Sequence, residues 1–118
     1  MSDLARLERM IRRRLDHFIA TSGSFLNDGL YVGVDRDGAL DRTNDGCCLL
    51  GVICLGEPRG PCESHGQGAA RILGVEWQTM AYLELGFMHG GVATPATPLG
   101  VSLQRLGARL RNDYTVES

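Results

Sequence analysis

Four cysteines and three histidines supply the thiol and imidazole groups of this 118-residue chain. Cys47 and Cys48 open an apolar segment, where a helix N-terminus would lower the pKa of a thiol. His65 or His89 is a candidate base for activating such a nucleophile. The residues around both cysteines are apolar and acidic, however, and these surroundings raise a thiol pKa. A cysteine-dependent enzyme centred on Cys47 or Cys48 with His65 is therefore the third of three functional hypotheses.

The same residue types can bind zinc. Cys54, Cys62 and His65 are three candidate ligands, the last two at a Cys-x-x-His spacing. A structural zinc site needs four ligands that converge on one point. Cys47 lies two helical turns before Cys54, about 10 Å along a helix. Because no second close pair completes the set, we expect neither a metal nor another cofactor.

Composition is that of an ordinary globular domain. Hydrophobic residues make up 43% of the chain and charged residues 22%, which excludes a disordered chain. The length suits one domain, residues 1–118, with one modest core. No apolar run approaches the roughly 20 residues of a membrane span, and the first residues lack the pattern of a secretion signal. We therefore expect a cytoplasmic protein that does not bind membranes.

All twelve basic residues are arginines, and the net charge is −2. Basic charge concentrates in residues 1–23 and 99–118, whereas residues 24–65 are acidic. This is not the overall positive field of a typical nucleic-acid binder. The run Arg12–Arg14 is interpreted as part of a solvated helix face.

The residues from Cys47 to Leu55 carry neither a charge nor a side-chain amide. A helix that is apolar on every side has no face to expose to water, so it belongs in the core. Asn44 or Asp45 can cap its start, and Gly56 can adopt the left-handed conformation that ends a helix. A buried strand is the alternative, but Gly51 within the run favours a helix. We predict a buried central helix that other helices cross.

Periodic patterns predict helices at both ends of the chain and a hairpin between them. The first helix begins after a cap at Ser2 or Asp3, and Thr97 with Pro98 begins the last one. Asp37-Gly38 is typical of a β-hairpin turn. The predicted apolar positions are Leu4, Leu7, Ile11, Leu15 and Phe18 in the first helix and Leu99, Leu103, Leu106 and Leu110 in the last.

Residues 66–87 have the spacing of a helix-turn-helix. A loop predicted over Glu57–Gly68 precedes a first helix, which ends at Gly74. Val75 fills the turn, Glu76 can cap the second helix, and a loop follows from Met88. If this motif binds DNA, its second helix enters the major groove. The DNA-contacting residues would then be Arg71, Trp77, Gln78, Ala81 and Tyr82.

Charge argues against DNA as the partner. The second helix carries Glu76 and Glu84 and no basic residue, whereas contacts to phosphates supply most of the affinity in such complexes. The same spacing serves any tight corner between two helices. DNA binding therefore requires that Arg12–Arg14 or the C-terminal arginines fold beside this helix.

The chain contains four short motifs in which it resembles other proteins. They are Cys-Cys-Leu-Leu-Gly-Val (47–52), Ala-Ala-Arg-Ile-Leu-Gly-Val (69–75), Leu-Glu-Leu-Gly-Phe (83–87) and Leu-Gly-Ala-Arg-Leu (106–110). In these the chain resembles small uncharacterised proteins of phages and bacterial mobile elements, of the integron-cassette kind. The resemblance spans about the last two-thirds of the chain, and its motifs are glycines and apolar positions. It implies an accessory protein but no particular activity.

Together these patterns predict a mainly α domain, an orthogonal bundle of about five helices around the Cys47–Leu55 helix, with one small β-hairpin. The first functional hypothesis is a non-enzymatic binding or protein-interaction module. Its partner would be another protein or a second copy of the chain, in a homodimer formed by exposed apolar surface on the first or last helix. A helix-turn-helix DNA-binding regulator is the second hypothesis.

Overall fold

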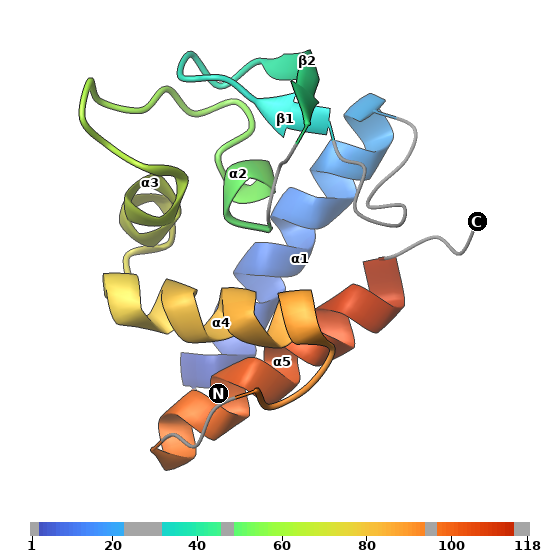
Figure 1. Cartoon of the computed structure of the whole chain (residues 1–118), viewed down its shortest axis with the longest axis vertical. Helices are drawn as coiled ribbons and strands as arrows, with labels where there is room; N and C mark the ends of the chain where they lie inside the picture. The colour runs from blue at the N-terminus through green and yellow to red at the C-terminus, as the bar shows by residue number, and fades with distance from the viewer. Residues whose placement is uncertain (1–2, 23–31, 46–48, 94–96, 115–118) are drawn as a thin grey trace.

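The computed structural model describes residues 3–22, 32–45, 49–93 and 97–114. These residues are mainly helical, as predicted, and Figure 1 shows their arrangement. The elements are α1 (Asp3–Ser22), β1 (Val32–Val34), β2 (Leu40–Asp45), α2 (Leu49–Ile53), α3 (His65–Leu73), α4 (Trp77–His89) and α5 (Pro98–Tyr114).

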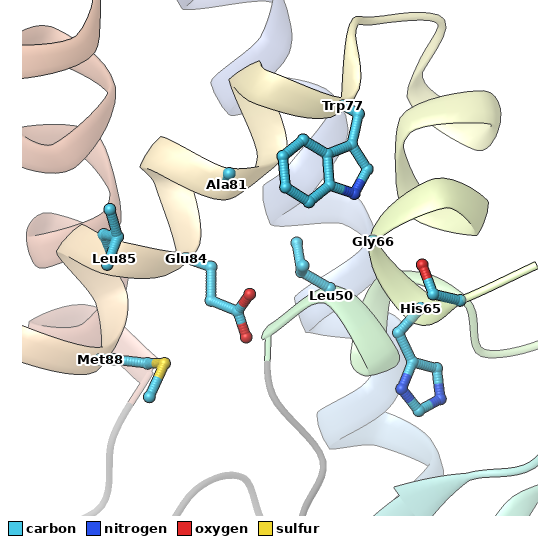
Figure 2. Close-up of a pocket in the computed structure, with 9 residues that line it drawn as sticks. Leu50, His65, Gly66, Trp77, Ala81, Glu84, Leu85 and Met88 are labelled. Carbon is cyan, nitrogen blue, oxygen red and sulfur yellow. The ribbon is translucent and has the colours of Figure 1, made fainter.

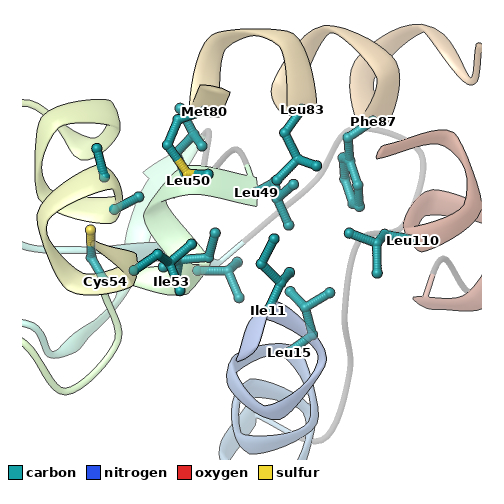
Figure 3. Close-up of a cluster of buried hydrophobic side chains, with 14 of the residues drawn as sticks. Ile11, Leu15, Leu49, Leu50, Ile53, Cys54, Met80, Leu83, Phe87 and Leu110 are labelled. Carbon is teal, nitrogen blue, oxygen red and sulfur yellow. The ribbon is translucent and has the colours of Figure 1, made fainter. Parts of the chain in front are cut away.

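The short helix α2 lies inside the molecule. All five of its residues are buried, and so are Cys54 and Leu55 in the turn that follows. It packs against α1, α3, α4 and β1, so its side chains meet those of several elements in one core (Figure 3). Gly56 ends the segment with a φ of +82°. Burial of the apolar segment is confirmed for its described part, but the helix is shorter than predicted: it ends at Ile53, and Cys54 to Gly56 form a turn.

The start of this segment differs from the prediction. Asn44 and Asp45 lie in strand β2, where Asp45 pairs with Val32 of β1, so neither residue caps a helix. A backbone that is hydrogen-bonded in a strand ladder does not have the geometry of an N-cap. The capping prediction for these two residues is therefore wrong. Cys47 and Cys48 lie outside the described residues.

Strands β1 and β2 pair antiparallel around a tight turn. The Asp35 carboxylate accepts hydrogen bonds from the backbone N–H groups of Asp37 (2.9 Å) and Ala39 (3.0 Å). Gly38 has a φ of +86°, and a Cβ atom there would lie 2.7 Å from the backbone nitrogen of Glu57. The backbone N–H of Gly56 also donates to the Gly38 carbonyl at 2.8 Å. The turn therefore packs directly on the segment that follows α2.

Helix α1 also packs against α2. Its predicted positions Leu7, Ile11, Leu15 and Phe18 are buried. Arg14 reaches the C-terminal end of α2, where its guanidinium donates to the carbonyls of Ile53 and Leu55 at 3.5 Å. A cation stabilises the carbonyl groups at a helix C-terminus. The run Arg12–Arg14 is therefore not one solvated face, because only Arg13 of the three is exposed.

The helix-turn-helix corner begins earlier than predicted. Helix α3 starts at His65, because Ser64 and Gln67 form a reciprocal capping box: Gln67 N–H donates to Ser64 Oγ at 3.1 Å, and Ser64 N–H donates to Gln67 Oε1 at 3.0 Å. The predicted loop Glu57–Gly68 therefore extends too far, because its last four residues belong to α3. Gly74, with a φ of +68°, ends α3 as predicted. The loop predicted from Met88 is also wrong at its start, because α4 continues to His89.

Helices α4 and α5 cross at two glycines. A Cβ atom at Gly86 would overlap the backbone carbonyl of Gln104, and one at Gly107 would overlap that of Leu83. Each helix therefore approaches the other backbone to backbone. The buried side chain of Gln104 fixes the connection between the helices, because its Oε1 accepts the backbone N–H of Ala93 at 2.8 Å.

The predicted cap and apolar face of α5 agree with the structure except at one position. Gly100 N–H donates to the Thr97 hydroxyl at 3.2 Å, which caps the helix. Leu103, Leu106 and Leu110 are buried, but Leu99 is 61% exposed. In the first turn of α5, Leu99 thus lies on the surface instead of the core.

Polar side chains join α1 to α5. Glu8 accepts hydrogen bonds from Arg12 (2.9 Å) and Arg109 (3.0 Å), and Arg12 also pairs with Asp113 at 2.8 Å. Tyr114 donates its hydroxyl hydrogen to an Asp16 carboxylate oxygen at 2.8 Å. Burial raises the pKa of the Glu8 carboxyl, but the hydrogen bonds from the two arginines outweigh burial and hold the pKa below its ordinary value.

Replacing a crossing glycine should destabilise the fold. We expect Gly107→Ala to lower the free energy of unfolding by about 3 kcal/mol, because the added methyl group must push α4 and α5 apart. Gly91→Ala is the matched control, since a Cβ atom there meets nothing within 4 Å. Urea denaturation measures both variants. Equal midpoints for the two would contradict the close crossing.

The network of Glu8 should make stability depend on pH. The pKa of Glu8 is lower in the folded state than in the unfolded chain. Its contribution to the free energy of unfolding is therefore complete above the unfolded-state pKa, about 4.3, and is lost as the pH falls through the folded-state pKa. We expect Glu8→Gln to reduce the free energy of unfolding by about 1 kcal/mol at pH 7 and by much less at about pH 3. Glu84→Gln, whose carboxylate has no described partner, is the control. A Glu8→Gln effect that is the same at both pH values would refute the assignment.

Candidate functional site

A groove of about 530 Å³ lies between α4, the first turn of α3 and Leu50 of α2 (Figure 2). Most of its lining is apolar, with a few polar groups at one end and in the middle. Such a combination is typical of binding sites in proteins. The lining residues are Leu50, Ser64, His65, Gly66, Trp77, Ala81, Glu84, Leu85 and Met88.

Helix α4 forms one long wall of the groove. Trp77, Ala81, Glu84, Leu85 and Met88 follow each other at helical spacing, so they share one face over three turns. Trp77 is 58% exposed and Met88 is 57% exposed. The core residues of α4 lie on an adjacent face, roughly 110° around the helix axis. The helix thus has two apolar faces, of which the described elements cover one.

The position of Trp77 depends on the corner between α3 and α4. The left-handed Gly74 allows Val75 N–H to donate to the Ala70 carbonyl at 2.9 Å, which closes the turn. Trp77 then lies beside the first turn of α3. A Cβ atom at Gly66 would be 3.2 Å from the indole nitrogen, so the absence of a side chain at Gly66 makes room for the ring.

Glu84 places a carboxylate within this apolar wall. Figure 2 shows the carboxylate directed into the groove, between Trp77 and Met88 along α4. In the described part of the chain it forms no ion pair and accepts no hydrogen bond. Glu8 and Glu63, by contrast, are both paired with arginines.

His65 lies at the other end of the groove, where the hairpin orients its ring. Its Nε2 is 3.0 Å from the Val34 carbonyl oxygen. Because a carbonyl oxygen can only accept, Nε2 carries a proton in this contact. The ring is therefore held by backbone structure at the edge of the groove.

The three candidate zinc ligands are not brought together. Cys54 is buried, with its Sγ 3.6 Å from the His65 carbonyl oxygen, and Cys62 is exposed. The imidazole of His65 contacts Val34 instead. No group of three or more His, Cys, Asp or Glu residues suited to a metal occurs among the described residues. The zinc interpretation of Cys54, Cys62 and His65 thus lacks the required convergence.

The thiol of Cys54 is also unsuited to nucleophilic chemistry. Burial raises its pKa to about 11, although Arg59 opposes this effect. Cys47 and Cys48, the candidate nucleophiles, lie outside the described residues. His65, their candidate base, lines the groove.

The candidate DNA-contacting residues occupy different surfaces. Arg71 binds both carboxylate oxygens of Glu63 at 2.9 Å and the Pro58 carbonyl at 3.1 Å. Its hydrogen bonds hold the pKa of Glu63 below the ordinary value. Trp77 faces the groove, whereas Gln78 and Tyr82 lie on another side of α4, beside the start of α5.

Several of the arginines that DNA binding would require form contacts within the molecule. Arg12 and Arg109 pair with Glu8, and Arg14 binds the end of α2. Arg111 donates to the carbonyls of Phe87 (2.9 Å) and Met88 (3.3 Å) at the C-terminal end of α4.

Sequence reasoning did not identify the groove. It considered Glu84 only as a charge that opposes DNA, and it did not single out Leu50, Gly66 or Met88 for a site. The available signal was Trp77, Ala81 and Met88, which form a second apolar stripe beside the one that contains the core-facing Met80. A helix that is apolar on two faces needs a covering for both.

The chain was compared with protein-family models, curated proteins and solved structures, and none of them matches. Of the helices that the structure describes, none is long and apolar enough to cross a membrane. The groove is therefore the basis of the functional argument.

Thiol labelling should distinguish the two described cysteines. At neutral pH we expect Cys54 to react with iodoacetamide on the order of a hundredfold more slowly than Cys62, because its thiol is buried and its pKa is raised. Digestion and mass spectrometry give the rate at each site, and labelling in denaturant is the control. Equal rates in the folded protein would contradict the burial of Cys54.

Proposed function

We propose that the chain is a non-enzymatic interaction module that binds a helical segment of another protein in the α4 groove. The observation that carries this proposal is the apolar face of α4 that the described elements leave uncovered, with Trp77 and Met88 both more than half exposed. Exposed apolar surface of this kind, rimmed by polar residues, is typical of protein-interaction sites. Tryptophan is also among the residues that contribute most to binding energy in interfaces.

The shape of the groove favours a helix as the bound segment. The lining of α4 extends from Trp77 to Met88, which corresponds to about 16 Å of helix rise. An amphipathic helix can place apolar side chains at i, i+3 or i+4, and i+7 along such a wall. Covering the exposed parts of Trp77 and Met88 would contribute about 1 to 2 kcal/mol for each.

The remaining hypotheses stay predictions. A DNA-binding regulator would use Trp77, Gln78 and Tyr82 with Arg71, and it would show binding to duplex DNA that weakens with salt. A cysteine enzyme would depend on Cys47 or Cys48. An origin in a mobile element and a cytoplasmic location are also proposals, the first of which depends on the sequence resemblance alone.

A selection experiment tests the proposed function. A displayed library of random peptides of about 16 residues is selected for binding to the folded protein. We expect recovered sequences to form amphipathic helices and to lose at least tenfold in affinity for Ala81→Arg, whose side chain fills the groove. Gln78→Arg places the same charge on another side of α4 and should bind as well as the original chain.

Circular dichroism checks that both variants remain folded. Peptides that bind the original chain, Ala81→Arg and Gln78→Arg equally well would show that the groove is not their site. That outcome, or a library with no specific binder, would overturn the proposal.

A further inference from the structure

We infer that the groove selects a helix that carries a basic side chain, arginine or lysine, positioned against Glu84 and the face of Trp77. This inference rests on the proposed function and adds the chemistry of the partner. It depends on the location of one carboxylate, without a partner among the described residues, within an otherwise apolar wall.

Glu84 has no intramolecular role in the described part of the chain that would explain its position. Its carboxylate points into the groove and has no described partner, whereas Glu8, Glu57 and Glu63 each pair with an arginine. Trp77 stands two turns earlier on the same face of α4. A single cation between the two could pair with the carboxylate and contact the indole ring.

Binding changes the energetic consequence of this carboxylate. In the free protein Glu84 is half-buried and still hydrated, so it needs no partner. A wholly apolar helix laid over the groove would remove that water and leave a buried, unpaired charge, which is strongly unfavourable. A helix with a basic residue at this position replaces the lost hydration with an ion pair. Glu84 thus discriminates between partners by penalising those without a cation.

Trp77 strengthens the same preference. The electron-rich face of an indole attracts a cation, most often the guanidinium of arginine. Arginine can also stack on the ring while it donates two hydrogen bonds to a carboxylate, which lysine cannot do. We therefore expect arginine to be preferred over lysine, with apolar residues on either side that contact Leu50 and Met88.

Defined peptides test this inference. Three helical peptides of about 16 residues share the same apolar positions and differ at one central residue, which is arginine, the neutral isostere citrulline, or glutamate. Trp77 is the single tryptophan of the chain, so its fluorescence reports binding without a label. We expect the arginine peptide to bind about tenfold more tightly than the citrulline peptide, with the glutamate peptide weakest.

Two variants place the effect on Glu84. In Glu84→Gln, the preference for arginine over citrulline should fall to about twofold or less, since the remaining contact is with the indole. Glu76→Gln removes a carboxylate that precedes the same helix but lies outside the groove, and it should keep the full preference. Circular dichroism confirms the fold of each variant.

The outcomes separate this inference from the proposed function. One outcome is that the arginine and citrulline peptides bind the original chain with equal affinity and that Ala81→Arg abolishes the binding of both peptides. In that case the groove binds helices without preferring a cation, so this inference is wrong and the proposed function stands. If no peptide binds, both fail. A Trp77 emission shift that appears with protein concentration alone, together with dimers in light scattering, would identify a second copy as the occupant and overturn the inference.

Discussion

The close crossing of α4 and α5 is the constraint on which the rest of the structure depends. Gly86 and Gly107 allow the two backbones to meet where any side chain would overlap a carbonyl group. This crossing sets the rotation of α4 about its own axis. Met80, Leu83 and Phe87 then point into the core, and the adjacent stripe, with Trp77 and Met88, is directed toward the groove. The exposed face is thus a consequence of how α4 is anchored.

Arginines stabilise the ends and connections of the helices around this anchor. Arg14 donates to the carbonyl of the last residue of α2 and to that of Leu55 in the turn that follows, and Arg111 donates to carbonyls in the last turn of α4. Arg36 and Arg59 donate to the Glu63 carbonyl in the connection between α2 and α3. That connection leads directly to the capping box and to the residues of α3 that form one wall of the groove. A chain with twelve arginines and no lysine therefore uses several of them as structural donors.

Helical periodicity predicted much of the fold, because burial of one face produces a regular pattern in α1 and α5. The buried central segment, the left-handed conformation of Gly56 and the helix end at Gly74 were also recognised from residue type. The start of α3 was missed because the capping box depends on Ser64 and Gln67 acting together within a glycine-rich stretch. The exposure of Leu99 could not be foreseen, because periodicity predicts an apolar face but not where the packing partner ends.

The candidate site was predicted less well than the fold. The sequence patterns drew attention to thiols, an imidazole and a helix-turn-helix spacing, which are chemical or motif signals. The groove instead depends on which apolar stripe of α4 remains uncovered, and that follows from three-dimensional packing of distant segments. Glu84 becomes informative only when its neighbours in space, Leu50 and Trp77, are known.

The central claim is that one apolar face of α4 is open to solvent in the folded protein. Acrylamide quenching of Trp77 fluorescence tests it most directly, because no other tryptophan contributes to the signal. The account predicts efficient quenching of the folded monomer, close to that of a solvent-exposed indole, and emission at the long-wavelength end of the tryptophan range. Blue-shifted emission from a ring that acrylamide cannot reach would show that this face is covered and would contradict the account.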